Sequence, residues 1–353
     1  MFRRRSPKRV LPPTSAIATS ENDLTAWFGQ LFGPAVDGEV WTGDDAALVT
    51  TGDKTLVTVD SMAEHVDFEL DWAMGADVGY KLVAINVSDI AAMGGRPTRA
   101  VATVQLGEDT HPSLVQEIAS GIAEAATRWE LRVVGGDIGS GSELTLTLTL
   151  LGEIEGPPIL RSGARPDDLV LVRGSLGAAH AGLLLLQLGA VDLDAVRAEI
   201  VDASGADGLA VLAALQLRPR ARLDEGRALA SFATSMIDIS DGLAIDLLRL
   251  CRASRVGCAI DGASVPLHGD LQHAAAAVAD FPAPIECGLL GGEDFELLFT
   301  APAEHLDAIH RALDDIGTSV SVIGKITAGG SCSIDGRTLE EWSHQAWDHL
   351  RIK

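Results

Sequence analysis

The segment Ile237-Asp238-Ile239-Ser240-Asp241-Gly242-Leu243 determines how the second half of this chain is interpreted. The apolar run over residues 236–239 predicts a strand, and Ser240-Asp241-Gly242 has the composition of a turn. Residues 243–251 then have the pattern of a helix, so the segment is a strand-turn-helix unit of the kind that builds αβ folds. It places two carboxylates, Asp238 and Asp241, where the strand ends and the helix begins.

Further aspartates occupy similar places earlier in the chain. Asp45, Asp60 and Asp137 each lie next to a strand-like run, and Asp89 lies on an apolar helix predicted over residues 76–93. Strand ends converge on one edge of a sheet, which is where αβ folds bind ligands. Taken singly, each acid also fits a turn or a helix cap. If the fold gathers them, they form a carboxylate cage that only hard cations neutralise.

The helix over residues 76–93 is apolar on nearly every side, which predicts that it is buried. Asp89 has no basic residue three or four positions away, and a buried carboxylate is costly unless it is paired or bound to a metal. A capped or water-bound Asp89 is the alternative.

The expected elements form an α+β fold of two αβ domains with mixed sheets. The break at Gly156-Pro157-Pro158 separates an N-terminal domain over residues 21–155 from a C-terminal domain over residues 156–353. Residues 1–20 are expected to be a disordered basic tail. The expected helices are 23–32, 113–128, 178–188 and 305–316, and the expected strands are 46–50, 55–59, 99–106, 131–134, 144–150, 169–173, 295–300 and 320–326.

A glycine-rich segment over residues 135–141 is expected to be a turn after the strand that ends at residue 134. Glycines let backbone N–H groups approach a phosphate closely. The segment lacks the Gly-Lys-Ser/Thr ending of a Walker A loop, and it does not open a helix as a dinucleotide fingerprint does. A plain turn remains the alternative.

Charge excludes some partners and indicates others. The net charge of −23 argues against nucleic-acid binding, which needs a basic surface. An acidic site that binds phosphates needs a mediating cation, and Mg²⁺ takes carboxylates together with substrate phosphates. Arg161, after the interdomain break, is either a phosphate-binding guanidinium or a solvated linker charge. The motifs of nucleophilic serine and cysteine enzymes are absent, which favours phosphoryl transfer by positioning and charge neutralisation.

The cysteines and the apolar segments indicate a cytoplasmic protein without a membrane span. Cys251, Cys258, Cys287 and Cys332 include no C-x-x-C pair, so we expect buried reduced thiols rather than a zinc or dithiol site. The longest apolar stretch, residues 176–191, is too short to cross a membrane. No apolar core of a signal peptide follows the basic residues near the start.

Seven stretches in this order resemble the thiamine-monophosphate kinase family, within the superfamily of aminoimidazole ribonucleotide synthetase, whose fold is called PurM-like. The resemblance covers about residues 22–350. The stretches are Gly43-Asp44-Asp45-Ala46-Ala47-Leu48, Val57-Thr58-Val59-Asp60, Asn86-Val87-Ser88-Asp89-Ile90-Ala91-Ala92-Met93-Gly94, Gly135-Gly136-Asp137, Arg161-Ser162-Gly163-Ala164, Ile237-Asp238-Ile239-Ser240-Asp241-Gly242-Leu243 and Gly291-Gly292-Glu293-Asp294-Phe295-Glu296-Leu297.

The resemblance implies a homodimer that binds ATP between its two domains with several Mg²⁺ ions, and an N-terminal domain that carries the metal site and the dimer interface. It implies direct transfer of the γ-phosphoryl group of ATP to thiamine monophosphate, giving thiamine diphosphate. The metal ligands implied by position are Asp45, Thr58, Asp60, Asp89, Asp137, Asp238 and Asp241. The implied ATP contacts are Gly136, Asp137, Arg161 and Ser240, and the implied substrate contacts include Glu293 and Trp347, whose ring would stack on thiamine.

Three positions depart from the pattern of the family. Asp67 stands where the family usually has histidine, so a carboxylate replaces an imidazole beside the substrate phosphate. Val59 stands where a hydroxyl residue is common, so only its backbone carbonyl is available to a metal. Phe295 replaces a common tyrosine. The alternatives are therefore a related ATP-dependent enzyme with another substrate, such as a ligase of purine synthesis, and a non-catalytic paralogue that binds Mg²⁺-nucleotide and regulates.

Overall fold

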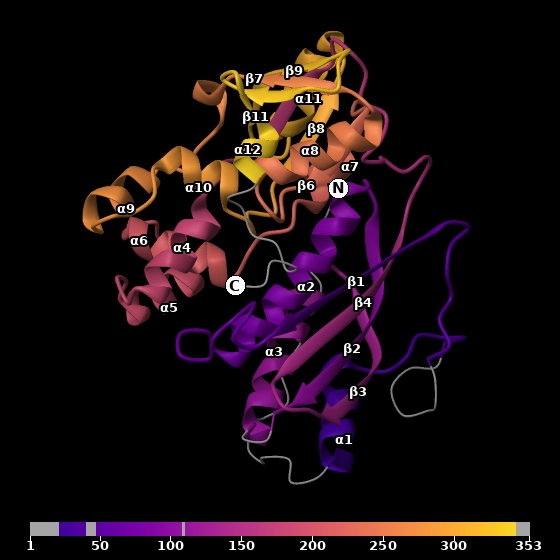
Figure 1. The fold of residues 1–353 in the computed structure, drawn as a ribbon. Coiled ribbons are helices and arrows are strands. Elements are labelled where there is room, and N and C mark those ends of the chain that lie inside the picture. The colour runs from indigo at the N-terminus through magenta and orange to yellow at the C-terminus, as the bar shows by residue number, and fades with distance from the viewer. Residues whose placement is uncertain (1–20, 40–46, 108–109, 344–353) are drawn as a thin grey trace.

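The structure is a computed structural model of the chain, and it describes residues 21–39, 47–107 and 110–343. These residues form two mixed sheets with helices packed against them, so the predicted α+β class is confirmed (Figure 1). The tail predicted over residues 1–20 lies outside the described residues.

The first sheet has four strands in the order β1-β4-β2-β3. Its β2–β3 pair is parallel, and the other two pairs are antiparallel. Helices α2 and α3 lie against one face of this sheet, and α1 lies near β3 (Figure 1). The bounds are α1 Glu21–Phe32, β1 Thr55–Ala63, α2 Gly75–Ala92, β2 Arg96–Leu106, α3 Pro112–Arg128, β3 Arg132–Ser140 and β4 Thr145–Glu153.

The second sheet has seven strands in the order β11-β10-β7-β9-β5-β8-β6. Its β10–β7 pair is parallel, and its other pairs are antiparallel. The bounds of the strands are β5 Leu169–Arg173, β6 Ser235–Asp238, β7 Gly257–Ile260, β8 Leu297–Ala301, β9 Val320–Thr327, β10 Cys332–Ile334 and β11 Arg337–Thr338.

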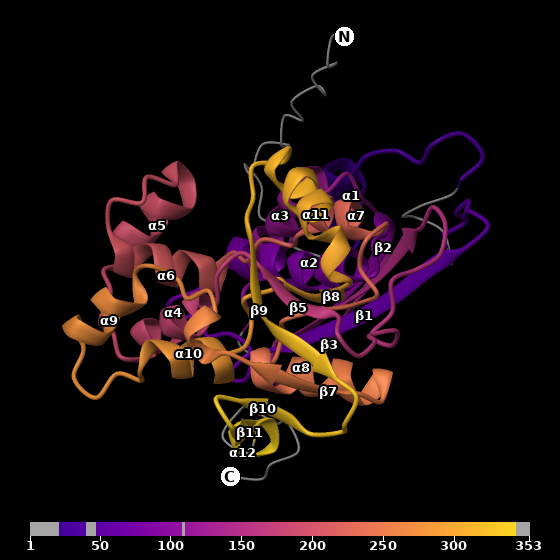
Figure 2. The same cartoon turned by 90° about the horizontal axis from the view of Figure 1, so that it is seen from above.

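Helices pack on both faces of the second sheet, and a separate group lies beside it. Helices α4, α5, α6, α9 and α10 form that group in both Figure 1 and Figure 2. The bounds are α4 Ala178–Gln187, α5 Leu193–Asp202, α6 Gly208–Leu217, α7 Leu223–Leu229, α8 Leu243–Ser254, α9 Leu271–Ala277, α10 Pro284–Leu290, α11 Leu306–Asp314 and α12 Leu339–Ser343, with the short 3₁₀ helices η1 Gly262–Ser264 and η2 Ala303–His305.

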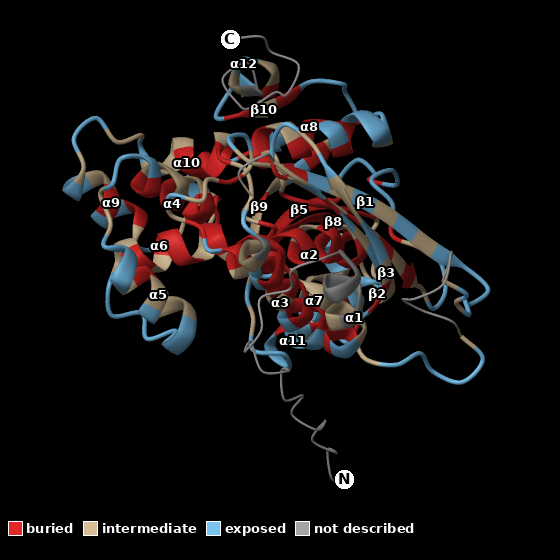
Figure 3. Ribbon diagram, turned by 90° about the horizontal axis from the view of Figure 1, so that it is seen from below, coloured by how far each residue is buried: buried red, intermediate tan, exposed pale blue. Residues whose placement is uncertain are grey.

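Helix α2 is buried along most of its length, as its apolar sequence predicts (Figure 3). Its first turn begins after Met74, whose N–H donates to Oδ2 of Asp77 at 3.0 Å. Near its other end, a Cβ placed on Gly226 of α7 would lie 2.0 Å from the carbonyl oxygen of Ala91. Glycine at this position therefore lets α7 approach α2 closely. Helix α2 is in contact with elements of both halves of the chain.

Three of the predicted elements are wrong. Asp60 does not end a strand but lies inside β1, which continues to Ala63. The segment 135–141 is not a turn, because β3 runs to Ser140 and Asp137 lies within it. A Cβ on Gly136 would lie 2.1 Å from the carbonyl oxygen of Ala102, so glycine at this position permits close strand pairing. Residues 47–50, the described part of the expected strand 46–50, belong to none of the numbered strands.

Apolar side chains fill the space between the helices and each sheet, where Figure 3 shows the buried residues. One cluster joins α2, α3 and the first sheet, and others line the two faces of the second sheet. Within the described residues, no helix combines the length and the hydropathy that a membrane crossing requires.

Candidate active site

Helix α2 connects the first sheet to the second through two consecutive polar residues. Ser88 donates from Oγ to Oδ2 of Asp238 on β6, over 2.6 Å. Asp89 accepts a hydrogen bond at Oδ2 from Oγ1 of Thr58 on β1. Residues that lie 150 positions apart in the chain are therefore neighbours here. Two of the predicted acids, Asp89 and Asp238, are therefore close together at this junction.

Asp60, Asp89 and Asp238 form the centre of the junction, and we call these three residues the acid cluster. Burial, followed by the negative charge of Asp89, raises the pKa of Asp60 to about 6. The same two causes raise the pKa of Asp238, which is 3% exposed, to about 7. The hydrogen bond from Ser88 and the charge of Arg161 lower the pKa of Asp238, but burial outweighs them. Asp60 and Asp238 therefore bind protons more tightly than ordinary carboxylates do.

Asp241 lies in the turn between β6 and α8, beside a further acid, Asp246. Oδ2 of Asp246 accepts the N–H groups of Ser240 at 3.1 Å and of Asp241 at 2.9 Å, which shapes the turn. Arg249 forms ion pairs with Asp241 and with Asp246, the latter over 2.8 Å. Burial raises the pKa of Asp246 to about 6. Sequence analysis missed Asp246, although its place five residues after Asp241 on a predicted helix was a usable signal.

Glu293 lies next to this turn and is held from both halves of the chain. Its N–H donates to the carbonyl oxygen of Ser240 at 2.8 Å, and a Cβ on Gly292 would lie 2.4 Å from the same oxygen. Its carboxylate pairs with Nζ of Lys81 on α2 at 2.6 Å and accepts from Nε2 of Gln216 on α6 at 2.7 Å. The side chain of Lys81 is only 6% exposed, so this ion pair is largely desolvated on the lysine side.

Glu293 also lines a cavity of about 700 Å³ in the second half of the chain. In its wall, Arg173 and Arg222 both pair with Glu296, at 2.8 and 2.6 Å. Arg220 is exposed and also lines the cavity. A polar cavity of this volume, next to the turn that carries Ser240, is large enough for a small charged ligand.

The register of the first sheet puts Asp137 on the opposite face from Asp60. Two rows of register partners cross the sheet, and they are Asp60, Leu148, Ala102 and Gly136 in the first row and Ser61, Thr147, Thr103 and Asp137 in the second. Because adjacent residues of a strand point to opposite faces, the two rows face opposite ways. The first row faces α2, and the second lies on the open face with the exposed side chain of Val59. Within one chain, Asp137 is not brought to the acid cluster.

Two other predicted residues have interactions at the edge of the site. Oδ2 of Asp67 accepts the N–H of Ala63 at 2.8 Å and so closes the turn after β1. Arg161 is exposed, and its carbonyl oxygen accepts the hydroxyl of Ser254 at 3.2 Å. Its guanidinium is close enough to lower the pKa of Asp238. Asp45 and Trp347, the remaining predicted site residues, lie outside the described residues.

The chemistry of the acid cluster fits a hard cation. None of the ion pairs found among the described residues includes Asp60, Asp89 or Asp238. Their negative charges therefore repel one another without a basic partner in contact. Carboxylate and hydroxyl oxygens are the ligands that Mg²⁺ accepts, and a phosphate-bearing substrate completes such a site.

Comparisons with known proteins agree with this geometry. The family models described as AIR synthase related protein, N-terminal domain, and AIR synthase related protein, C-terminal domain, match residues 43–154 and 165–337. These two domains, with an acid cluster at their junction, define the class of protein: an αβ protein of the AIR synthase related type.

Individual relatives narrow this class. The thiamine-monophosphate kinase of Pyrococcus abyssi is 34% identical over 310 residues, which is 87% of this chain and 90% of the relative. The crystal structure of thiamine-monophosphate kinase from Stenotrophomonas maltophilia has a TM-score of 0.76 at 31% identity and covers 86% of this chain and 92% of its own. A structure described as AaThiL complexed with AMPPCP and TMP has a TM-score of 0.71 at 31% identity, with 90% and 94% covered. The chain belongs to the thiamine-monophosphate kinase family.

Proposed function

We propose that this protein is a kinase that transfers the γ-phosphoryl group of ATP to thiamine monophosphate and forms thiamine diphosphate. The observation that carries the proposal is the acid cluster, whose carboxylates repel one another at the junction of the two sheets. The relatives named above support the choice of substrate, because they are thiamine-monophosphate kinases and one related structure contains AMPPCP and TMP.

Carboxylate, hydroxyl and carbonyl oxygens of the chain would hold Mg²⁺ in this reaction. The proposed ligands are oxygen atoms of the side chains of Asp45, Thr58, Asp60, Asp89, Asp137, Asp238 and Asp241, and the backbone carbonyl of Val59. When bound, the ions supply the positive charge that phosphate groups need beside so many carboxylates. The raised pKa values of Asp60 and Asp238 support this assignment, since neither group has a cationic partner in contact within the described part of the chain.

The proposed reaction uses no nucleophile from the chain. A phosphate oxygen of thiamine monophosphate attacks the γ-phosphorus of ATP, the bond to the bridging oxygen breaks, and ADP leaves. Arg161 binds phosphate oxygens, and Ser240 and the backbone at Gly136 and Asp137 orient the nucleotide. Such positioning supplies most of what phosphoryl transfer requires from a protein.

The substrate would bind on the side of Glu293 and its cavity. Glu293 is the proposed partner of the thiamine end, and Trp347 the proposed stacking residue. Lys81 and Gln216 keep the carboxylate of Glu293 in a defined place, so the substrate meets an oriented group. Asp67 is the proposed substrate contact that departs from the family, and its hydrogen bond to Ala63 holds it in the turn after β1.

We also propose a homodimer that forms through the open face of the first sheet. Val57 and Val59 of β1 and Val101 of β2 share this face and are 65%, 57% and 38% exposed. Apolar side chains on an open sheet face favour burial against another surface. Asp137 lies on the same face, so we propose that it contributes to the metal site of the second copy rather than to that of its own chain.

The test is a product assay with the purified protein, ATP, Mg²⁺ and thiamine monophosphate, with thiamine diphosphate and ADP measured by chromatography. We expect equal amounts of both products and no reaction when a chelator removes the metal. The Asp89→Asn variant is the matched control, because it keeps the shape of the residue and removes its charge. Nucleotide binding without thiamine diphosphate in the wild type would refute the proposal and would favour a regulatory paralogue or another acceptor substrate.

A further inference from the structure

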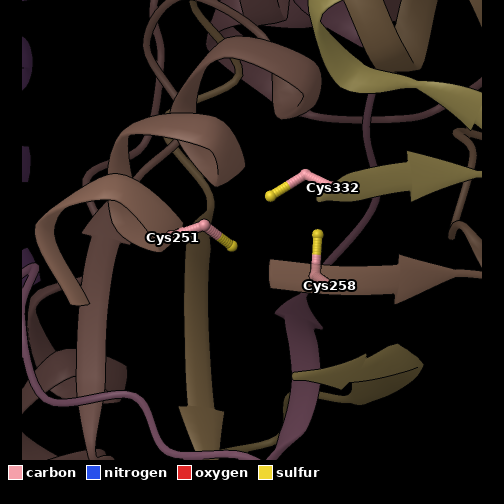
Figure 4. A group of neighbouring side chains, drawn as sticks. All are labelled: Cys251, Cys258 and Cys332. Atoms are coloured by element: carbon pink, nitrogen blue, oxygen red, sulfur yellow. The ribbon is translucent and has the colours of Figure 1, made fainter. Parts of the chain in front are cut away.

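Three cysteines from distant positions in the chain meet in the second half of the fold. Cys251 lies on α8, Cys258 on β7 and Cys332 on β10. Their sulfur atoms all lie within 4.8 Å of one another, and Figure 4 shows them directed toward a common space. The residues are 0%, 1% and 2% exposed. Sequence analysis correctly expected buried thiols but not their convergence, because no two of them have the spacing of a metal motif.

Local features of the fold bring the three sulfurs together. Cys258 and Cys332 are register partners in the parallel β7–β10 pair. Before them, a Cβ on Gly257 would lie 2.2 Å from the carbonyl oxygen of Ser331, so glycine permits the close approach of the two strands. The N–H of Cys258 donates to the same oxygen at 3.1 Å. Helix α8 packs over this edge of the sheet and adds Cys251 as the third sulfur.

The separation of the sulfurs matches the size of a metal-thiolate site. Three sulfurs that each lie about 2.3 Å from one ion are about 4 Å apart. The observed limit of 4.8 Å is therefore within about 1 Å of the separation that an ion requires. Small shifts of the three cysteine side chains are therefore enough to bring their sulfur atoms to this separation.

The net charge of three thiolates and one ion favours a divalent ion over a monovalent one. Three thiolates and one divalent ion leave a net charge of −1, whereas a monovalent ion would leave −2, and a buried charge is costly. Thiolate ligands favour soft ions over the hard Mg²⁺ of the acid cluster.

We propose that Cys251, Cys258 and Cys332 form a binding site for a soft divalent metal ion of the Zn²⁺ or Cd²⁺ type, separate from the acid cluster. Binding breaks three S–H bonds, forms three metal–sulfur bonds and releases three protons to water, without oxidation. The ion enters through the edge of the second sheet, where β10 and β11 are only three and two residues long. Short edge elements of this kind open locally at low free-energy cost.

The test uses Cd²⁺ as the probe because cadmium thiolates absorb in the near ultraviolet. The full-length reduced protein is titrated with Cd²⁺ in excess Mg²⁺, which occupies carboxylate sites, and absorbance and proton release are followed. We expect one Cd²⁺ per chain with a thiolate charge-transfer band, about three protons released per ion, and a higher thermal midpoint. The absence of the band in the wild type would overturn the proposal, whatever the variants do.

Two variants assign the band to the three cysteines. Cys332→Ala should lose the band and bind Cd²⁺ at least tenfold more weakly, and Cys332→Ser serves as a second variant if the alanine protein unfolds. Cys287→Ala is the matched control, because Cys287 is also buried but belongs to the cluster around α4 and α10. It should keep the band unchanged. A band that survives in both Cys332 variants, or that disappears in Cys287→Ala, would refute the assignment.

Discussion

Asp238→Asn is expected to stabilise the metal-free protein while it abolishes activity. The carboxylate of Asp238 is 3% exposed, and its pKa is raised to about 7 by burial and by the charge of Asp89. Asparagine has the same shape, carries no charge and can still accept the hydrogen bond from Ser88. The substitution therefore removes an unfavourable buried charge without leaving a cavity.

The size of the stabilisation by Asp238→Asn, and its dependence on pH, follow from the raised pKa of Asp238. The pKa of Asp238 rises from the ordinary value of 3.8 to about 7. This shift corresponds to a cost of at most about 4 kcal/mol for ionising the buried carboxyl group. The folded state binds the proton of Asp238 more tightly than the unfolded state, so the cost is complete above pH 7 and disappears as the pH falls toward 4. We expect Asp238→Asn to raise the free energy of unfolding by about 2–4 kcal/mol at pH 8, and by less than half of that at pH 5. The variant should therefore unfold at a higher urea concentration than the wild type.

The assay is urea unfolding of both proteins in the presence of a chelator, with Asp168→Asn as the matched control. Asp168 is 5% exposed but lies among donors, since it accepts the N–H of Arg165 at 2.9 Å and the hydroxyl of Thr234 at 2.7 Å. Loss of its charge should destabilise the protein by about 1–2 kcal/mol at pH 8. Destabilisation by Asp238→Asn at pH 8, or a gain that does not change with pH, would refute the reasoning.

The remaining predictions concern the dimer, the substrate and the contact between the two halves. Asp60→Asn and Asp137→Asn should each abolish phosphoryl transfer in folded dimers. When the two variants are mixed in equal amounts and exchange subunits, half of the dimers contain one chain of each kind, and one of the two sites in such a dimer is intact. The mixture should therefore recover about a quarter of wild-type turnover. No recovery would mean that both residues act in one chain. Trp347→Ala should raise KM for thiamine monophosphate far more than KM for ATP, and equal increases would exclude stacking. Lys81→Met should lower the free energy of unfolding by about 1–2 kcal/mol, since it leaves the carboxylate of Glu293 with one partner fewer. The double variant with Glu293→Gln should recover part of this loss, and no recovery in urea unfolding would contradict the role of the ion pair.

Helix α2 was predictable because its sequence is apolar on nearly every side, and the structure buries it between the two sheets. Asp89 was expected to need a partner outside its own helix, and the structure gives it Thr58 of β1. The partner itself was not predictable from local sequence. Hydrogen bonds such as that between Ser88 and Asp238 join residues 150 positions apart, and only the packing of the two sheets determines them.

The turn predicted over the glycine-rich residues 135–141 was the clearest wrong prediction. Glycines at positions 135, 136 and 139 predict a turn, but the same residues also suit a strand whose backbone lies very close to its neighbour. The parallel pairing of β2 with β3 creates such a contact at Gly136. This pairing also decides the face on which Asp137 lies, so its separation from the acid cluster of the same chain could be inferred only after the register was known.

The central claim is that the acid cluster and a second copy of the chain together support phosphoryl transfer to thiamine monophosphate. A single-turnover experiment with γ-labelled ATP, Mg²⁺ and thiamine monophosphate tests it most directly. The claim predicts that the label passes from ATP to thiamine diphosphate in the wild type, and that neither Asp60→Asn nor Asp137→Asn alone produces labelled product. Label that appears only as inorganic phosphate, or label that reaches thiamine diphosphate in either variant at the wild-type rate, would contradict it.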